Sequence, residues 1–91
     1  MKIPKVVTRF VIKIGDKFLA SEDFWNPYSK WSDLKLVSNL SEIPESLRFE
    51  TYEKAKYFLM DCLESHYFLR KMNAKVVHKY YLDFVDEVNE K

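Results

Sequence analysis

The 91-residue sequence contains little glycine and little cysteine, and it has no long hydrophobic run. Its only glycine is Gly15, whereas phosphate-binding loops and nucleophile elbows need several residues that bring the backbone close to a ligand. The single cysteine, Cys62, excludes an internal disulfide framework and an all-cysteine zinc site. No stretch approaches the roughly 20 apolar residues of a membrane span, and no signal-peptide core follows Met1. We therefore expect one cytoplasmic domain over residues 1–91, with no cofactor and no membrane partner.

Aromatic residues, in contrast, are abundant. They make up 16% of the chain, while 15 Lys and Arg against 14 Asp and Glu leave a net charge of only +1. A domain of this size buries only about 60% of its unfolded surface, so not every ring can be interior. Some rings must cap an open sheet face, contact a partner or build a self-association surface. The near-neutral charge is far from the strongly basic balance of most nucleic-acid-binding domains.

The first half of the sequence predicts a β-hairpin and further short strands. Apolar residues alternate over 5–14, and 17–20 returns after a two-residue turn. Gly15 in the first central position of that turn suits type II′. A third strand is expected over 34–38, and residues 47–49 are expected to pair briefly at a sheet edge.

The second half predicts one long helix and a closing strand. Thr51 is the expected N-cap, and apolar residues recur at three- and four-residue steps to about Met72, with Asn73 as a stop signal. Residues 74–84 alternate as a strand does, and a strand is expected at least through Tyr81. Residues 81–89 are left open between a strand, a short acidic helix and a frayed tail. The order ββ-β-α-β predicts an α+β fold, a small antiparallel sheet with one long helix packed on one face.

A long connection over 21–33 holds the candidate binding residues. Trp and Tyr are common anchors of protein interfaces, and rigid scaffolds present such residues on loops. The same rings can stack on nucleic-acid bases, or fold back to close one end of the core. The spacing does not separate these readings. The expected partner-binding set is Glu22, Asp23, Phe24, Trp25, Tyr28, Lys30 and Trp31.

Catalytic and metal-binding patterns are weak. Cys62 and His66 are four residues apart on one helical face, and His78 is a third potential ligand, but no second cysteine is present. The stripe that contains Cys62 and His66 is also the one expected to pack on the sheet, where a buried thiol is inert. Acidic residues around the long connection lack an accompanying set of oxyanion donors. We expect neither a metal site nor an enzyme.

Three segments resemble parts of small accessory proteins from phages and prophages of Gram-positive bacteria. Residues 10–20 resemble their "yvIk-dgKyL" opening, residues 47–55 are similar to their "a-kF-tyeeA" entry into a helix, and residues 73–77 resemble their closing strand. These segments cover less than half of the chain. The long aromatic connection and the residues after Tyr80 depart from the pattern.

The resemblance implies a non-enzymatic protein that binds a host bacterial protein in the cytoplasm. Targets of such proteins include replication factors, repressors and defence nucleases, the last being the targets of anti-CRISPR inhibitors. The alternative is a small nucleic-acid-binding module that uses exposed rings and the hairpin cations Lys2, Lys5, Arg9, Lys13 and Lys17. A homodimer that buries edge strands and aromatic residues is a third reading.

Overall fold

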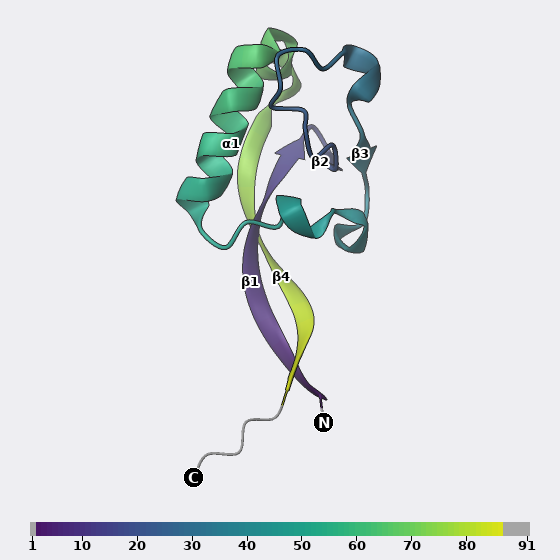
Figure 1. Ribbon diagram of the computed structural model, residues 1–91, viewed down its shortest axis with the longest axis vertical. Helices are drawn as coiled ribbons and strands as arrows, with labels where there is room; N and C mark the ends of the chain where they lie inside the picture. Colours follow the sequence, from purple (N-terminus) through teal and green to yellow (C-terminus); the bar gives the residue numbers. More distant parts are fainter. Residues whose placement is uncertain (1, 87–91) are drawn as a thin grey trace.

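The computed structural model describes residues 2–86 and confirms the α+β fold, with element order β-β-β-α-β. A four-stranded antiparallel sheet has the strand order β3-β2-β1-β4 (Figure 1). One main helix, α1 (Tyr52–Ser65), packs against β1 and β4. The strands are β1 (Lys2–Ile14), β2 (Lys17–Leu19), β3 (Leu36–Val37) and β4 (Ala74–Asp86).

The hairpin is confirmed, although its strands differ in length from the prediction. Gly15 has a φ of 65°, while Asp16 does not have a positive φ, which is the combination required by a type II′ turn. β1 begins at Lys2 rather than residue 5, because it pairs with β4 along its whole length. β3 has only two residues because the short β2 pairs with it at Phe18 and Leu19 alone.

The predicted long helix is wrong in its second half. Thr51 is the N-cap as expected, since its hydroxyl accepts a hydrogen bond from the Lys54 amide at 3.2 Å. The α-helix ends at Ser65, and a 3₁₀ segment, Tyr67–Met72, follows it. His66 breaks the helix with φ −131° and ψ 83°, and its ring packs against the loop that follows β2. Within residues 2–86, no helix is both long and apolar enough to cross a membrane.

The end of the chain resolves one open alternative. β4 continues through Asp86, so the strand alternative holds over 81–86, and residues 87–89 lie outside the described part. Pairing with β1 in continuous register, from Ile14↔Ala74 to Lys2↔Asp86, explains the extension. The expected pairing near 47–49 is confirmed by a bridge in which Phe10 and Phe49 exchange backbone hydrogen bonds of 2.8 and 2.9 Å.

The core lies on both faces of the sheet. Adjacent residues Val11 and Ile12 point to opposite faces, and both are buried. α1 covers the face of Phe10, whose ring meets Tyr52 edge-on at 6.1 Å. Segment 40–48 covers the opposite face, where the Tyr81 hydroxyl donates to the Leu40 carbonyl at 3.0 Å. Buried residues of these layers include Ile43, Leu47, Ala55, Leu59, Cys62 and Leu69.

Beyond Phe10 the two long strands leave this body as a two-stranded ribbon, defined here as residues 2–9 of β1 and 79–86 of β4 (Figure 1). The ribbon makes the molecule elongated, with extents of 53 × 23 × 20 Å. Its position at one end leaves both strands without a covering layer along most of its length. Large apolar side chains are therefore exposed on it, namely Ile3, Val6, Tyr80 and Leu82.

Candidate functional site

The connection after β2 forms a closed loop, called here the aromatic loop, over residues 21–35. Its ends meet where the Ala20 amide donates to the Lys35 carbonyl at 2.8 Å. The buried Ser21 hydroxyl donates to the Asp33 carbonyl at 2.9 Å and accepts from the Lys35 amide. Compact surface loops with adjacent ends are often functional, because their shape does not depend on a partner.

Hydrogen bonds also fix the interior of the aromatic loop. The Asn26 side-chain oxygen accepts a hydrogen bond from the Tyr28 backbone N–H at 2.9 Å. The backbone N–H of Asn26 donates to the Asp23 backbone carbonyl at 3.0 Å. The Asp33 carboxylate accepts from the Lys30 amide at 2.7 Å. Short polar side chains of this kind stabilise turns by binding nearby backbone amides. The polar residues of the loop therefore fix the conformation of the backbone segments that connect its aromatic residues.

Residues at the C-terminal end of α1 contact the aromatic loop and fix its position. Phe24 is completely buried and stacks on the His66 ring, with the ring centroids 4.1 Å apart. The His66 Nε2 atom lies 3.2 Å from the Asn26 carbonyl oxygen, and the Ser65 hydroxyl donates to the Trp25 carbonyl at 2.8 Å. The helix break at His66 thus places two side chains where they fix the loop.

Three of the four predicted rings remain exposed on this framework. The exposed fractions of Trp25, Tyr28 and Trp31 are 47%, 88% and 61%. Trp31 is also positioned by an edge contact with Phe68, with ring centroids 4.6 Å apart. Exposed aromatic side chains on a fixed backbone are suited to binding, because little conformational freedom remains to be lost.

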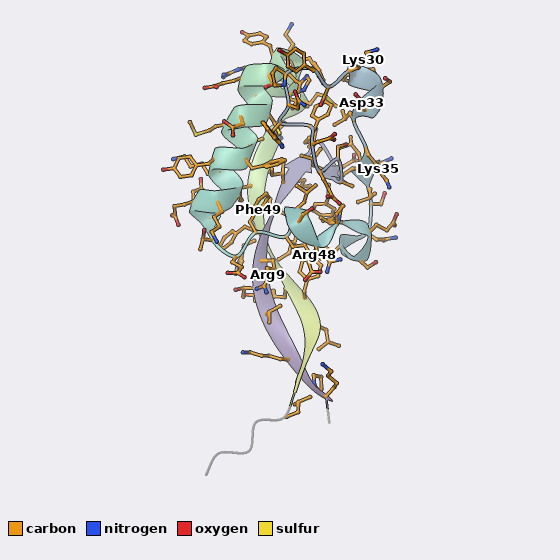
Figure 2. The ribbon with its side chains drawn as sticks, viewed as in Figure 1. Arg9, Lys30, Asp33, Lys35, Arg48 and Phe49 are labelled. Carbon is orange, nitrogen blue, oxygen red and sulfur yellow. The ribbon has the colours of Figure 1, made fainter. Side chains whose placement is uncertain are left out.

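The remaining predicted residues separate into two groups. Phe24 corrects the prediction, because a completely buried ring positions the loop and cannot contact a partner. Glu22, Asp23 and Lys30 are exposed on the loop beside the rings. Figure 2 shows Lys30 and Asp33 at the end of the molecule that lies away from the ribbon.

The three potential metal ligands, Cys62, His66 and His78, make separate structural contacts. Cys62 is buried in the core, and burial, assisted by the negative charge of Asp61, raises the pKa of its thiol to about 12. His66 holds the aromatic loop, while His78 stacks on Phe10 at a centroid distance of 4.9 Å. Residues 2–86 contain no group of three His, Cys, Asp or Glu side chains arranged to hold a metal ion.

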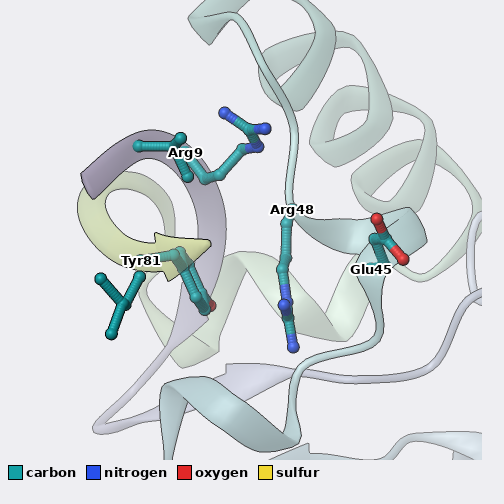
Figure 3. Close-up of a pocket in the computed structure, with 6 residues that line it drawn as sticks. Arg9, Glu45, Arg48 and Tyr81 are labelled. Atoms are coloured by element: carbon teal, nitrogen blue, oxygen red, sulfur yellow. The ribbon is translucent and has the colours of Figure 1, made fainter. Parts of the chain in front are cut away.

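A small open cavity of about 190 Å³ lies where the ribbon leaves the body (Figure 3). Its central groups are structural. The Arg48 guanidinium lies 4.6 Å from the centre of the Tyr81 ring, and its Nε donates to the Ile43 carbonyl at 2.9 Å. Burial raises the pKa of Tyr81, although the Arg48 charge opposes the shift. The cavity is lined by Val7, Arg9, Glu45, Arg48, Tyr81 and Leu82.

Sequence reasoning missed the supports of the aromatic loop and the exposed ribbon. Ser65 and His66 were assigned to the middle of a helix, although residues 65–68 are all of modest helix propensity. That run was the available signal for a break. The exposure of Tyr80 and Leu82 had no signal in the alternating pattern, because alternation does not reveal whether a strand face is covered.

Comparison with protein-family models, curated proteins and solved structures finds no match to this chain.

Proposed function

We propose that this is a non-enzymatic binding protein whose aromatic loop attaches to a protein of a bacterial host and modulates or inhibits it. The observation that carries the proposal is the exposure of Trp25, Tyr28 and Trp31 on a loop fixed at both ends and against α1. Trp and Tyr are over-represented among residues that dominate binding energy. A loop that is ordered before binding keeps more of that energy as affinity.

The class of partner follows from the resemblance to phage and prophage proteins. A defence nuclease is the first target to test, as for anti-CRISPR inhibitors. Inhibition by occlusion needs only surface, and a standard interface uses roughly 800 Å² of the 6525 Å² that this chain exposes. Glu22 and Asp23, beside the rings, favour a partner surface with a basic rim, since charges at the rim set specificity.

The test begins with capture of a partner from a nuclease-treated lysate of a Gram-positive bacterium, followed by titration of the purified pair. Replacing Trp25 and Trp31 together by Ala is expected to weaken binding at least about 100-fold. Tyr57→Ala is the matched control, because Tyr57 is 64% exposed but lies on α1. The control is expected to bind as the original protein does.

Unchanged affinity of the double variant, with a cooperative thermal transition retained, would reject the proposal. Tyr28→Ala guards against a folding artefact, because Tyr28 is the most exposed ring and its removal leaves the core intact. A Tyr28→Ala protein that melts normally and binds more weakly supports the same site. One that binds normally, together with an unaffected double variant, assigns the partner to another surface.

A second candidate function, nucleic-acid binding, rests on two like-charged pairs in the sheet. Arg9 stands opposite Lys79, and Lys13 stands opposite Lys75, all four on one face of the β1–β4 pair. Directly opposed like charges destabilise a sheet, and a bound polyanion relieves them. Two of the other hairpin cations have an acid opposite them in register, since Lys5 pairs with Asp83 and Lys2 with Asp86.

Salt dependence separates this candidate from the first. If the cations bind nucleic acid, the affinity for a labelled single-stranded oligonucleotide falls steeply as salt rises. Replacing Lys75 and Lys79 by Glu is then expected to abolish that binding while leaving the host-protein affinity unchanged. Oligonucleotide binding that is absent at low salt rejects the second candidate.

A further inference from the structure

The outer edge of β4 is open along the strand. β4 ends the sheet order β3-β2-β1-β4, and no backbone group among residues 2–86 pairs with its outer side. A long edge strand presents a row of unpaired N–H and C=O groups that another strand can bind. Proteins commonly block such an edge with proline or a bulge, and β4 contains neither.

The backbone groups that face this open edge follow from the bridge between Phe10 and Phe49. Phe10 exchanges its hydrogen bonds with Phe49, so its N–H and C=O groups point away from β4. Its cross-strand neighbour His78 therefore points its own groups to the free edge, and backbone direction alternates along a strand. Tyr80 and Leu82 share this outward direction, while Lys79 and Tyr81 bind β1.

The other long edge of the ribbon is blocked. Pro4 occupies a β1 position with the same parity as Phe10, which faces the open side of β1. Proline has no N–H to donate, and edge strands use it to prevent further pairing. Of the two ribbon edges, only that of β4 presents an uninterrupted set of donors and acceptors.

We propose that β4 pairs antiparallel with β4 of a second copy of this chain, about a two-fold axis at Tyr81. Outward-facing residues must meet one another, so the axis places Tyr80 opposite Leu82 of the second copy. The same register places Lys79 opposite Asp83 of the second copy, twice by symmetry. Opposed unlike charges stabilise a sheet, so Lys79 favours this partner and this register.

Exposure on the ribbon supports the same occupant. Tyr80 and Leu82 are 64% and 63% exposed on one face of the β1–β4 pair, and edge pairing gives each of them an apolar neighbour from the second copy. A two-stranded ribbon is marginally stable alone in water, whereas three or more strands with an apolar face support one another. Pairing of two copies makes a four-stranded layer of the two ribbons. This inference goes beyond the proposed function, because the aromatic loops lie at the other end and stay free (Figure 1).

The first experiment measures molar mass by light scattering over a range of protein concentrations. The unmodified chain is expected to pass from monomer to dimer as concentration rises. Tyr80→Pro removes an outward N–H that β1 does not use, so this variant is expected to stay monomeric. Tyr80→Ala keeps the N–H and is the matched control, expected to form the dimer with weaker affinity. Near-ultraviolet circular dichroism checks that each variant is folded.

The second experiment tests the register by charge reversal. Lys79→Asp alone opposes like charges across the axis and is expected to weaken the dimer about tenfold or more. Asp83→Lys also does so, and it is made together with Lys5→Asp because Lys5 stands opposite Asp83 in the same chain. Combining Lys79→Asp with this pair of substitutions restores opposite charges across the axis and is expected to recover most of the affinity.

Two results would overturn the pairing of β4 with its own copy, and a third would overturn the proposed axis. The first is that the unmodified protein is a monomer at its highest soluble concentration. The β4 edge would then pair with a different protein rather than with a second copy. The second is a dimer that Tyr80→Pro forms as well as Tyr80→Ala, which places the contact elsewhere, including the aromatic loop. Failure of the combined charge reversal to recover affinity rejects the axis at Tyr81.

Discussion

The aromatic loop and the ribbon lie at opposite ends of the molecule, and both expose large apolar side chains (Figure 1). They hold those side chains in different ways. The loop closes on itself through Ser21, and its buried Phe24 stacks on His66, so the backbone that carries the exposed rings is fixed. The ribbon has two strands that pair with each other and no covering layer on the exposed face of Val6 and Leu82.

This difference suggests two kinds of interaction. A loop that is supported from below presents a fixed surface, which suits a folded partner of complementary shape. A strand with an open edge presents unpaired backbone groups that bind another strand, while cross-strand side-chain pairs such as Lys79 with Asp83 favour one partner and one register. The loop is therefore the better candidate for a specific host protein, and the ribbon is the better candidate for pairing with its own copy.

The largest expected effect comes from removing the buried support of the loop. Phe24→Ala is expected to lower the free energy of unfolding by about 3–5 kcal/mol, because it leaves a cavity beside His66. Tyr28→Ala, in the same loop but exposed, is expected to change it by less than about 0.5 kcal/mol. Urea unfolding followed by tryptophan fluorescence measures both. Equal losses of stability in the two variants would show that the buried Phe24 does not support the loop more than the exposed Tyr28 does.

The closure of the loop gives the next effect. Ser21→Ala removes a buried hydroxyl that serves one donor and one acceptor, and leaves both without their partner. The expected loss is about 1–3 kcal/mol. Ser29→Ala is the control, because the Ser29 hydroxyl donates a single bond, to the Asp23 carbonyl, at the surface of the loop. A Ser21→Ala protein as stable as the Ser29→Ala protein would contradict the role given to the closure.

The sequence predicted the sheet and the start of the helix better than it predicted the site. Thr51 and Gly15 act through local backbone chemistry, which a sequence displays directly. The break at His66 depends on contacts with residues some 40 positions away, and no local pattern carries them. Phe24 and Trp25 are adjacent aromatic residues with opposite fates, because only the folded loop decides which ring faces α1.

The ribbon was the feature least accessible to sequence reasoning. Alternation over residues 5–14 and 74–81 predicted two strands, but the extent of their pairing to Lys2 and Asp86 depends on register. The prediction treated Tyr81 onward as an ambiguous end, since its apolar spacing also fits a helix. Pairing with a neighbouring strand outweighed that local ambiguity.

Alkaline titration compares a thiol in the core, Cys62, with a phenol at the root of the ribbon, Tyr81. The pKa of Cys62 is about 12 in the folded protein, against 9.0 for an ordinary thiol, because burial disfavours the thiolate and Asp61 adds to the effect. Above pH 9 the unfolded chain releases this proton first, so stability falls as pH rises, by up to about 1.4 kcal/mol per pH unit. Below pH 9 the thiol is protonated in both the folded and the unfolded chain, so it adds no pH dependence to stability. Tyr81, at the root of the ribbon, also has a raised pKa and acts in the same direction.

Cys62→Ala and Tyr81→Phe separate the two contributions. Denaturant midpoints are measured across the alkaline range. They are expected to fall less steeply with pH in Cys62→Ala than in the unmodified protein, because the substitution removes the thiol, which is more deeply buried than the Tyr81 hydroxyl. Tyr81→Phe is expected to reduce the slope by a smaller amount, since Tyr81 is only partly buried. An unchanged slope in Cys62→Ala would mean that the thiol is accessible to water in the folded chain.

The smallest change in the free energy of unfolding is expected for a substitution on the ribbon, at Val6. Val11, in the same strand β1, provides the control. Val6→Ala is expected to change the free energy of unfolding of the monomer by less than about 0.5 kcal/mol, because Val6 is mostly exposed. Val11→Ala removes methyl groups that are completely buried on the sheet face opposite α1, and about 2 kcal/mol is expected. Urea unfolding at a low protein concentration measures the monomer. A large effect of Val6→Ala there would mean that the apolar face of the ribbon is already covered within one chain.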